Sequence, residues 1–238
     1  MGNPVKIKAK VLVARKYGDS LYEYLIKPEG RIPRFNAGQF LHLALDPYDP
    51  SYEWPESRVF SIASGNTRTE YLRIVISVKG KFTTRIANEL YPGAEVFIKM
   101  PYGNFTIRQS GKTLVLIAGG SGVAPFVSFL ESAIDHKLSR EINFFYGYRS
   151  PELDIFHDLW VECKARIDGF NMVIYDQSLE IDYGVEKRSG ILNIVEIFNE
   201  SEPESEFYLS GPWSMIDSFN KSLLSFGVNK DSVLIDEW

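Results

Sequence analysis

The sequence of 238 residues has one cysteine and three histidines. A single cysteine, Cys163, excludes an internal disulfide bond and any iron–sulfur or zinc site made of cysteines alone. The histidines, His42, His136 and His157, do not have the spacing of metal ligands. We therefore expect no metal site, and the low cysteine content favours a reducing, cytoplasmic compartment.

Long apolar runs and an excess of positive charge are missing as well. No stretch approaches the length of a membrane-spanning helix, and the N-terminal MGNPVKIKAK has no apolar signal core. The net charge of -5 argues against nonspecific binding of nucleic acid. We expect a protein that binds neither membrane nor nucleic acid. Its length allows one large domain or two modest ones.

The most informative segment is TLVLIAGGSGVAPFVSFL at residues 113–130. Its apolar run, residues 114–118, is typical of a strand buried on both faces of a parallel sheet. Pro125 stands where the first turn of a helix would begin. Between them lie Gly119, Gly120, Ser121 and Gly122. A strand, a glycine turn and a helix N-terminus can cradle a phosphate. An ordinary tight turn between a strand and a helix remains the alternative.

The two halves of the chain have different periodicities. Residues 5–108 show short β segments separated by turn signals, which predicts a small antiparallel barrel. We expect strands near residues 5–11, 22–26, 39–45, 58–64, 72–79 and 94–99, and a short helix over 82–90. After residue 111 strands alternate with helices, as in βαβ units on a parallel sheet. We expect strands near 114–118, 142–147, 172–175, 207–209 and 233–235, and helices near 125–136, 152–165, 191–199 and 212–226.

Two barrel segments carry groups that suit a nucleotide. In RVFSIAS, residues 58–64, Arg58 and Phe60 share one face of a strand while Ser61 points to the other. A guanidinium can pair with a phosphate, and an aromatic ring can lie beside a planar ring. In VKGKFTTRIA, residues 78–87, Thr83 or Thr84 can cap a helix whose free N–H groups hold an anion. A strand that begins with an arginine, and a plain helix cap, are the alternatives.

Together with four other segments, these motifs resemble the ferredoxin–NADP⁺ reductase family. The other four are PYGNFTI (101–107), IAGGSGVAPF (117–126), FFYGYRS (144–150) and YLSGPWSM (208–215). The resemblance covers nearly the whole chain. It implies two domains: an FAD-binding antiparallel β-barrel, residues 1–110, and an NAD(P)-binding α/β domain with a parallel sheet, residues 111–238.

The resemblance also assigns roles to individual residues. It implies that Arg58 binds the FAD pyrophosphate, that Phe60 packs on the isoalloxazine and that Ser61 reaches towards N5. The remaining cofactor-binding residues implied for FAD and for NADP(H) or NAD(H) are Ile76, Val78, Lys79, Gly80, Thr83, Thr84, Gly119, Gly120, Ser121, Gly122, Pro125, Arg149, Ser150, Gly211, Pro212 and Met215. The implied catalytic residues are Ser61, Ser210, Asp236 and Trp238, with Trp238 stacked over the isoalloxazine. Residue 210 is serine where the family commonly has cysteine.

The implied activity is that of a monomeric FAD-dependent reductase. It passes electrons between NAD(P)H and a separate carrier such as ferredoxin or flavodoxin, or an oxygenase component, by hydride transfer between nicotinamide C4 and flavin N5. We expect a preference for NADPH, because Arg149 and Ser150, with Lys187 and Arg188 later in the chain, suit a 2′-phosphate. Lys187 and Arg188 are equally well explained as a solvated loop. A reductase of free flavin and a non-catalytic flavin-binding adaptor subunit remain alternatives.

Overall fold

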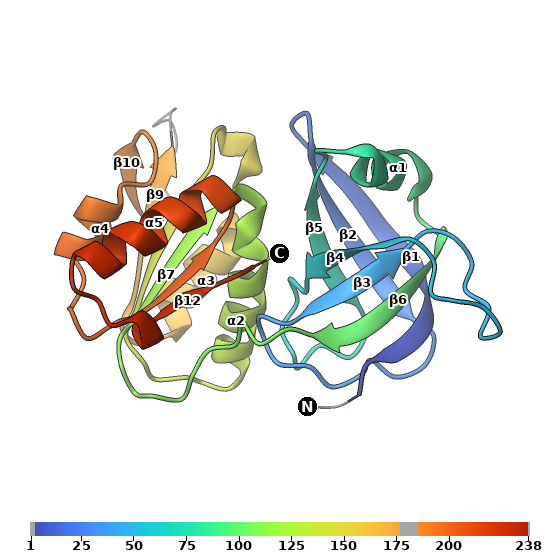
Figure 1. The fold of residues 1–238 in the computed structure, drawn as a ribbon, viewed down its shortest axis with the longest axis horizontal. Helices are drawn as coiled ribbons and strands as arrows, with labels where there is room; N and C mark the ends of the chain where they lie inside the picture. Colours follow the sequence, from blue (N-terminus) through green and yellow to red (C-terminus); the bar gives the residue numbers. More distant parts are fainter. Residues whose placement is uncertain (1–2, 177–184, 238) are drawn as a thin grey trace. The chain divides into compact units, whose positions relative to one another are not determined.

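The short alternating segments of the N-terminal half form six antiparallel strands that nearly close into a barrel (Figure 1). The strands follow the order β4-β3-β6-β1-β2-β5 in the sheet. The two edge strands meet where the N–H of Ala63, just after β4, donates to the carbonyl of Arg73 in β5 at 2.8 Å. The predicted barrel is confirmed. Its elements are β1 (Val5–Tyr17), β2 (Leu21–Pro28), β3 (Phe40–Ala44), β4 (Ser57–Ser61), β5 (Leu72–Ser77), α1 (Lys81–Glu89) and β6 (Glu95–Tyr102).

In this computed structural model the described residues are 3–176 and 185–237. They divide into two units, one ending at Ile107 and one beginning at Arg108. The sequence-based boundary lies three residues later, between residues 110 and 111.

Side-chain alternation explains the core of the barrel. Along β1, Ala9 and Val11 are buried inside while Lys8 and Lys10 point outwards. At the closing end of the barrel, the buried carboxylate of Glu23 pairs with Arg73 at 3.1 Å. The Arg73 guanidinium also donates to the carbonyl of Ala63 at 3.2 Å. These bonds hold the chain immediately after β4, the strand that carries Arg58, Phe60 and Ser61.

The C-terminal unit is a six-stranded parallel sheet in the order β10-β9-β8-β7-β11-β12. Helices cover both faces of this sheet, so its apolar strands are buried on both sides (Figure 1). Ile194 of α4 and Ile216 of α5 pack on one face, while Phe126 of α2 and Trp160 of α3 contact Phe144 on the other. The predicted parallel α/β unit is confirmed. Its elements are β7 (Leu114–Gly119), α2 (Ala124–Asp135), β8 (Ile142–Gly147), α3 (His157–Arg166), β9 (Phe170–Asp176), β10 (Glu186–Ser189), α4 (Ile194–Asn199), β11 (Glu206–Ser210), α5 (Trp213–Ser225) and β12 (Val233–Ile235).

The strand order reverses between β7 and β11. From β7 the chain moves through β8 and β9 to one edge of the sheet, and β11 and β12 then occupy the other side of β7. The turns that leave β7 and β11 are therefore neighbours at the carboxyl edge of the sheet. Open α/β sheets bind ligands at the carboxyl ends of their strands, at the point where the strand order reverses.

Several elements differ from the expectations: β1 continues to Tyr17 instead of ending at residue 11, and α4 begins at Ile194 instead of residue 191. The strand β10 was not predicted, because its sequence EKRS is short and charged and has no apolar alternation. The helix expected over 152–165 begins only at His157, since a separate 3₁₀ turn at Pro151–Leu153 precedes it. In the described ranges, no helix is both long enough and apolar enough to span a membrane.

Candidate functional site

The glycine turn after β7 has the local structure that a phosphate cradle requires. The chain leaves the buried strand through a 3₁₀ turn, Gly120–Val123, and enters α2, whose first turn contains Pro125. Gly120 has a φ of 54°, the left-handed region that favours glycine. No protein atom lies within 4 Å of the position that a Cβ of Gly120 would take. The backbone at Gly120 is therefore open to a ligand.

This turn lies directly against the loop after β11. A Cβ on Gly122 would come within 2.5 Å of the Cα of Gly211. A Cβ on Gly119 would meet the sulfur of Met215 at 2.9 Å and Pro212 at 3.0 Å. The two loops are thus packed backbone to backbone, which glycine alone permits. The structure brings together two sets of predicted site residues that are about 90 positions apart in the sequence.

Ser210 and Asp236 form a buried polar pair. Ser210 ends β11 and Asp236 follows β12, the strand that pairs with β11, so the two side chains leave adjacent strands at the same edge. The Ser210 hydroxyl donates to Oδ2 of Asp236 at 2.9 Å, and the N–H of Asp236 donates to the carbonyl of Leu209. The residues are 1% and 5% exposed. A buried carboxylate needs such donors, because removing it from water without them is costly.

In the barrel, β4 places Arg58 beside the start of α1. The Arg58 guanidinium lies over the ring of Phe82, the second residue of α1, at 5.1 Å from the ring centre. It also pairs with Glu56 at 3.1 Å and donates to the carbonyl of Ser57. About half of the Arg58 side chain remains exposed (54%). The arginine and the helix N-terminus, two separate expectations of phosphate binding, are therefore neighbours.

The N-terminus of α1 is organised by Gly80 and Thr83. Gly80 is the N-cap residue, so the expectation that Thr83 or Thr84 occupies that position is wrong. The Thr83 hydroxyl instead reaches back one turn: it accepts from the N–H groups of Lys79 and Gly80 at 3.0 and 3.1 Å and donates to the Gly80 carbonyl. A Cβ on Gly80 would meet no atom within 4 Å.

An open depression of about 640 Å³ lies along this segment of the barrel. Two lysines, Lys79 and Lys81, line it next to Gly80. Arg85, which also lines it, is already bound to Asp46 and Glu89 at 2.8 and 2.9 Å. The other lining residues are Val78, Thr84, Asn88 and Glu89.

Two further barrel residues, Phe60 and Ile76, differ in how deeply their side chains are buried. Phe60 is half-buried and packs against the barrel core, which leaves part of its ring accessible. Ile76 is only 1% exposed and belongs to that core. The side chain of Ile76 therefore packs inside the barrel and is not available to a cofactor. A contribution of its backbone to cofactor binding stays a prediction.

Arg149 and Ser150 follow β8, the parallel neighbour of β7, so they lie at the same carboxyl edge of the sheet as the glycine turn. Arg149 is exposed, and the Ser150 carbonyl accepts from the N–H of Leu153. Arg188 lies in β10 and is fully engaged: its guanidinium binds Glu200 at 2.6 and 2.9 Å and Glu186 at 2.7 Å. These partners raise the pKa of Arg188. The interpretation of Arg188 as part of a solvated loop is therefore wrong, whereas its role as a 2′-phosphate ligand stays a prediction that these ion pairs disfavour.

Comparison with known proteins agrees with this architecture. Residues 116–221 match the family model described as an oxidoreductase NAD-binding domain. The reductase component of propane 2-monooxygenase from Rhodococcus jostii (strain RHA1) is 28% identical over 223 residues, which are 90% of this chain and 57% of the relative. The same component from Mycolicibacterium smegmatis (strain ATCC 700084 / mc(2)155) is 30% identical, over 86% of this chain and 59% of the relative. The chain thus spans less than two thirds of the length of these relatives.

Two solved structures match nearly the whole chain. The flavohem-like FAD/NAD-binding domain of nitric oxide dioxygenase from Vibrio cholerae O1 biovar El Tor has a TM-score of 0.80 at 20% identity, with 97% of both chains covered. A ferredoxin NADP⁺ reductase from Neisseria gonorrhoeae with bound FAD and NADP has a TM-score of 0.76 at 21% identity, covering 97% of this chain and 98% of that one. The expected resemblance is confirmed for the fold. The chain has the two-domain fold of ferredoxin–NADP⁺ reductase-like proteins, and residues 116–221 match an oxidoreductase NAD-binding domain.

Three residues of this chain that lie at the candidate sites were missed in the sequence. Glu56 and Phe82 both contact the Arg58 guanidinium. The spacing of Glu56 two residues before Arg58 was a usable signal, whereas the contact with Phe82 depends on tertiary structure. Trp213, immediately after Pro212 at the start of α5, is 62% exposed beside the packed glycine loops.

One predicted catalytic residue, Trp238, lies outside the described residues, and its stacking on the flavin stays a prediction. Within the described ranges, no three histidine, cysteine, aspartate or glutamate side chains gather where they would hold a metal ion.

Proposed function

We propose that this protein is an FAD-dependent reductase that takes electrons from NAD(P)H and passes them to a separate acceptor. The observation that carries the proposal is the pair of loops at the point where the strand order reverses. There Gly122 and Gly211 lie backbone to backbone, while Gly120 presents open backbone towards solvent. A close-packed glycine turn at a helix N-terminus supports the binding of a dinucleotide pyrophosphate.

The barrel supplies a second set of groups that fits the FAD pyrophosphate. Arg58 offers a half-exposed guanidinium beside the N-terminus of α1, and the position of a Gly80 Cβ is open. Backbone N–H groups, the helix dipole and a guanidinium are the usual phosphate ligands of proteins. In this proposal Arg58 and the first turn of α1 bind the pyrophosphate, and the accessible part of Phe60 packs beside the flavin ring.

Bound FAD and NAD(P)H would supply the hydride and one-electron chemistry of the reaction. The protein has to hold both groups, align them and limit access of water. Ser210 and Asp236 serve this end, because the hydroxyl donates to the carboxylate and is thereby held in one orientation. Family members commonly have cysteine at this position, and the serine hydroxyl provides a similar polar contact in a slightly smaller volume.

The acceptor is proposed to be an oxygenase component or another one-electron carrier protein. The supporting facts are the names of the relatives, which include reductase components of propane 2-monooxygenase and a ferredoxin reductase of carbazole 1,9a-dioxygenase.

The direct test is an absorbance spectrum of the purified protein before and after anaerobic addition of NADPH or NADH. We expect a flavin spectrum that bleaches when either nucleotide is added. A colourless protein that oxidises NAD(P)H only when flavin is supplied would favour a reductase of free flavin. Bound flavin that neither nucleotide reduces would contradict the proposal and favour an adaptor subunit.

A further inference from the structure

Arg140, in the turn before β8, binds the segment with which the C-terminal unit begins. Its guanidinium is 8% exposed. It donates to the carbonyl of Lys112 at 2.5 Å, to the carbonyl of Arg108 at 2.6 Å and to the hydroxyl of Ser110 at 2.9 Å. Its remaining contact is an ion pair with Glu206, the first residue of β11, at 3.1 Å. One side chain therefore fixes three residues of the segment 108–112 to the parallel sheet.

A second set of bonds secures the start of the same segment. The N–H of Arg108 donates to the hydroxyl of Tyr208 in β11 at 2.9 Å, and its guanidinium donates to the carbonyl of Asp231 at 2.5 Å. Both acceptors belong to the C-terminal unit. The connecting chain thus becomes part of that unit at Arg108.

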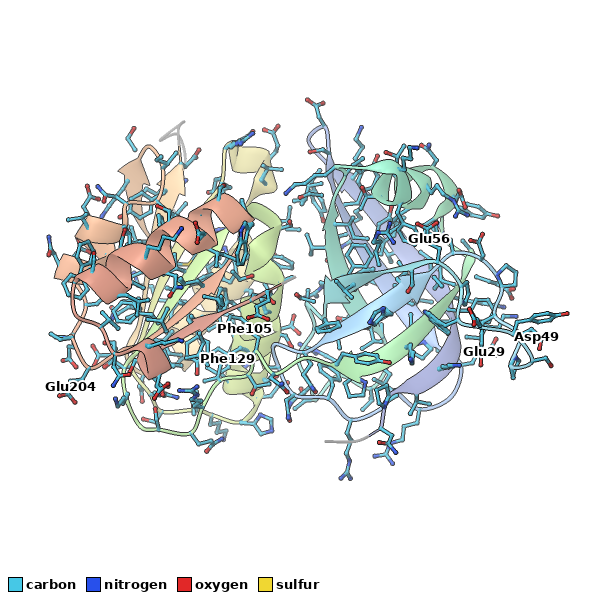
Figure 2. The ribbon with its side chains drawn as sticks, viewed as in Figure 1. Glu29, Asp49, Glu56, Phe105, Phe129 and Glu204 are labelled. Atoms are coloured by element: carbon cyan, nitrogen blue, oxygen red, sulfur yellow. The ribbon has the colours of Figure 1, made fainter. Side chains whose placement is uncertain are left out.

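The barrel holds the chain up to the residues just before this point. Phe105, labelled in Figure 2, is 7% exposed, and the Gly103 carbonyl accepts from the Gln39 side chain at 3.0 Å. Gly38 has a φ of 93°, and a Cβ there would fall within 1.8 Å of the Phe105 carbonyl oxygen. The barrel backbone is therefore in direct contact with Phe105. Between this anchor and Arg108 lie only Thr106 and Ile107.

We propose that Arg140 is a positioning residue for hydride transfer, because it confines the pivot between the two units to Thr106 and Ile107. The proposal rests on the proposed function, in which one unit carries the nicotinamide and the other the flavin. Each residue released from the sheet adds free φ and ψ angles. Loss of the Arg140 contacts would free residues 109–112 and leave Arg108 held only by its bonds to Tyr208 and Asp231, so the residue that ends the pivot would be fixed less firmly to the sheet. Reactive rings held on a looser connection meet in the right geometry less often. A planar guanidinium with several donors suits this role better than the single ammonium group of lysine.

The test combines two variants of the FAD-loaded protein with a matched control. In Arg140→Gln/Glu206→Gln both charges are removed together, so no buried charge loses its partner. Ser110→Ala is a milder variant that removes one acceptor without touching a charge. The control is Arg166→Gln, which removes an exposed arginine paired with Glu162 one helical turn away. Hydrogen exchange of residues 106–112, the melting temperature, NADPH affinity and the rate of anaerobic flavin reduction are measured for each.

In the double variant we expect exchange of the Arg108 and Lys112 amides to rise about tenfold or more, because their bonds to the hydroxyls of Tyr208 and Ser110 depend on the segment that Arg140 holds in place. Flavin reduction should slow by about tenfold to a hundredfold while NADPH affinity stays unchanged. Ser110→Ala should show smaller changes of the same kind, and Arg166→Gln none.

Any of the following results would overturn the proposal. Unchanged exchange of the Arg108 and Lys112 amides would show that Arg140 does not hold the segment. Faster exchange with an unchanged rate of flavin reduction would show that the Arg140 contacts are purely structural. The same conclusion would follow if the slower reduction came with an equal loss of NADPH affinity, or with a collapse of the melting temperature in both variants. If the unaltered protein reduces no flavin at all, the proposed function itself fails and the positioning role fails with it, while the exchange data still report whether Arg140 holds the segment.

Discussion

The start of α1 in the barrel and the paired loops of the parallel sheet both depend on glycine, but for opposite reasons. At the barrel site no protein atom lies near the position of a Gly80 Cβ, and Arg58 is half-exposed. At the sheet site a Cβ on Gly122 would meet the backbone of Gly211 at 2.5 Å. The glycine of the barrel site faces open space, whereas at the sheet site the open backbone of Gly120 stands beside a close-packed contact between Gly122 and Gly211.

The glycines at the two sites therefore have different structural roles. Gly122 is required by the fold, because only a residue without a Cβ lets the two loops pack together. Gly80 has extended backbone with a φ of -161°, which any residue can adopt. A glycine is therefore not required there by the fold, and its missing side chain leaves room for a ligand. Substitutions at the two sites should therefore fail in different ways.

The largest effect is expected for Gly122→Ala. The added methyl group meets backbone atoms rather than a flexible side chain, so the loops must move apart. Overpacking of this kind costs about 1–3 kcal/mol of unfolding free energy. Urea unfolding followed by circular dichroism measures it, and NADP⁺ binding should be lost in parallel. An alanine variant as stable as the parent would show that the two loops are not held as closely as described.

Arg58→Ala should weaken FAD binding without unfolding the barrel. A charge-assisted contact with a phosphate contributes about 1.5–3 kcal/mol, or roughly a tenfold to hundredfold change in affinity. Titration of the apoprotein with FAD at moderate salt gives the dissociation constant. Arg166→Ala is the control, since Arg166 has a similar exposure and an acidic partner but lies in α3. FAD binding as tight as in the parent would rule out the phosphate role of Arg58.

Gly80→Ala tests whether the open space at the barrel site belongs to a ligand. The backbone tolerates alanine, and the loss of an N-cap glycine costs at most about 1 kcal/mol of stability. FAD affinity should nevertheless fall about tenfold, because the methyl group would stand where the backbone approaches the phosphate. The same FAD titration, with a melting curve beside it, checks this. A variant that binds FAD normally would place the pyrophosphate elsewhere.

The smallest effect concerns the choice between NADPH and NADH. Arg149 is exposed at the end of β8, whereas Arg188 is bound to Glu186 and Glu200. Arg149→Ala should therefore lower the ratio of kcat/KM for NADPH to that for NADH about fivefold, as expected for an exposed charge contact of about 1 kcal/mol. Arg188→Ala should leave the ratio unchanged. Equal ratios in the parent and in Arg149→Ala would exclude Arg149 as the 2′-phosphate ligand.

The sequence was most informative where periodicity and glycine spacing determine structure. Alternation in the first half and the buried apolar run before Gly119 predicted both sheets and the position of the glycine turn. The strand β10 escaped notice because its charged residues are held by partners such as Glu200, which is distant in the sequence. Propensity alone cannot reveal strands that depend on their neighbours.

The candidate sites were predictable as separate motifs but not as assemblies. That Ser210 donates to Asp236, or that Arg58 lies over Phe82, depends on which strands and helices are adjacent in space. The N-cap was misplaced by three residues because Thr83, a good capping residue, acts from within the helix on Gly80. The contacts of Arg140 also had no sequence signal, since they join residues about 30 to 70 positions apart.

The most direct test of the division between the two sites is hydrogen exchange of the protein with one ligand at a time. FAD is expected to slow the exchange of backbone amides at residues 79–84 and to leave those at 119–123 unchanged. NADP⁺ is expected to slow exchange at residues 119–123 and 211–213 when FAD is already bound. Protection by FAD at the glycine turn of the parallel sheet, with none at the start of α1, would contradict the account.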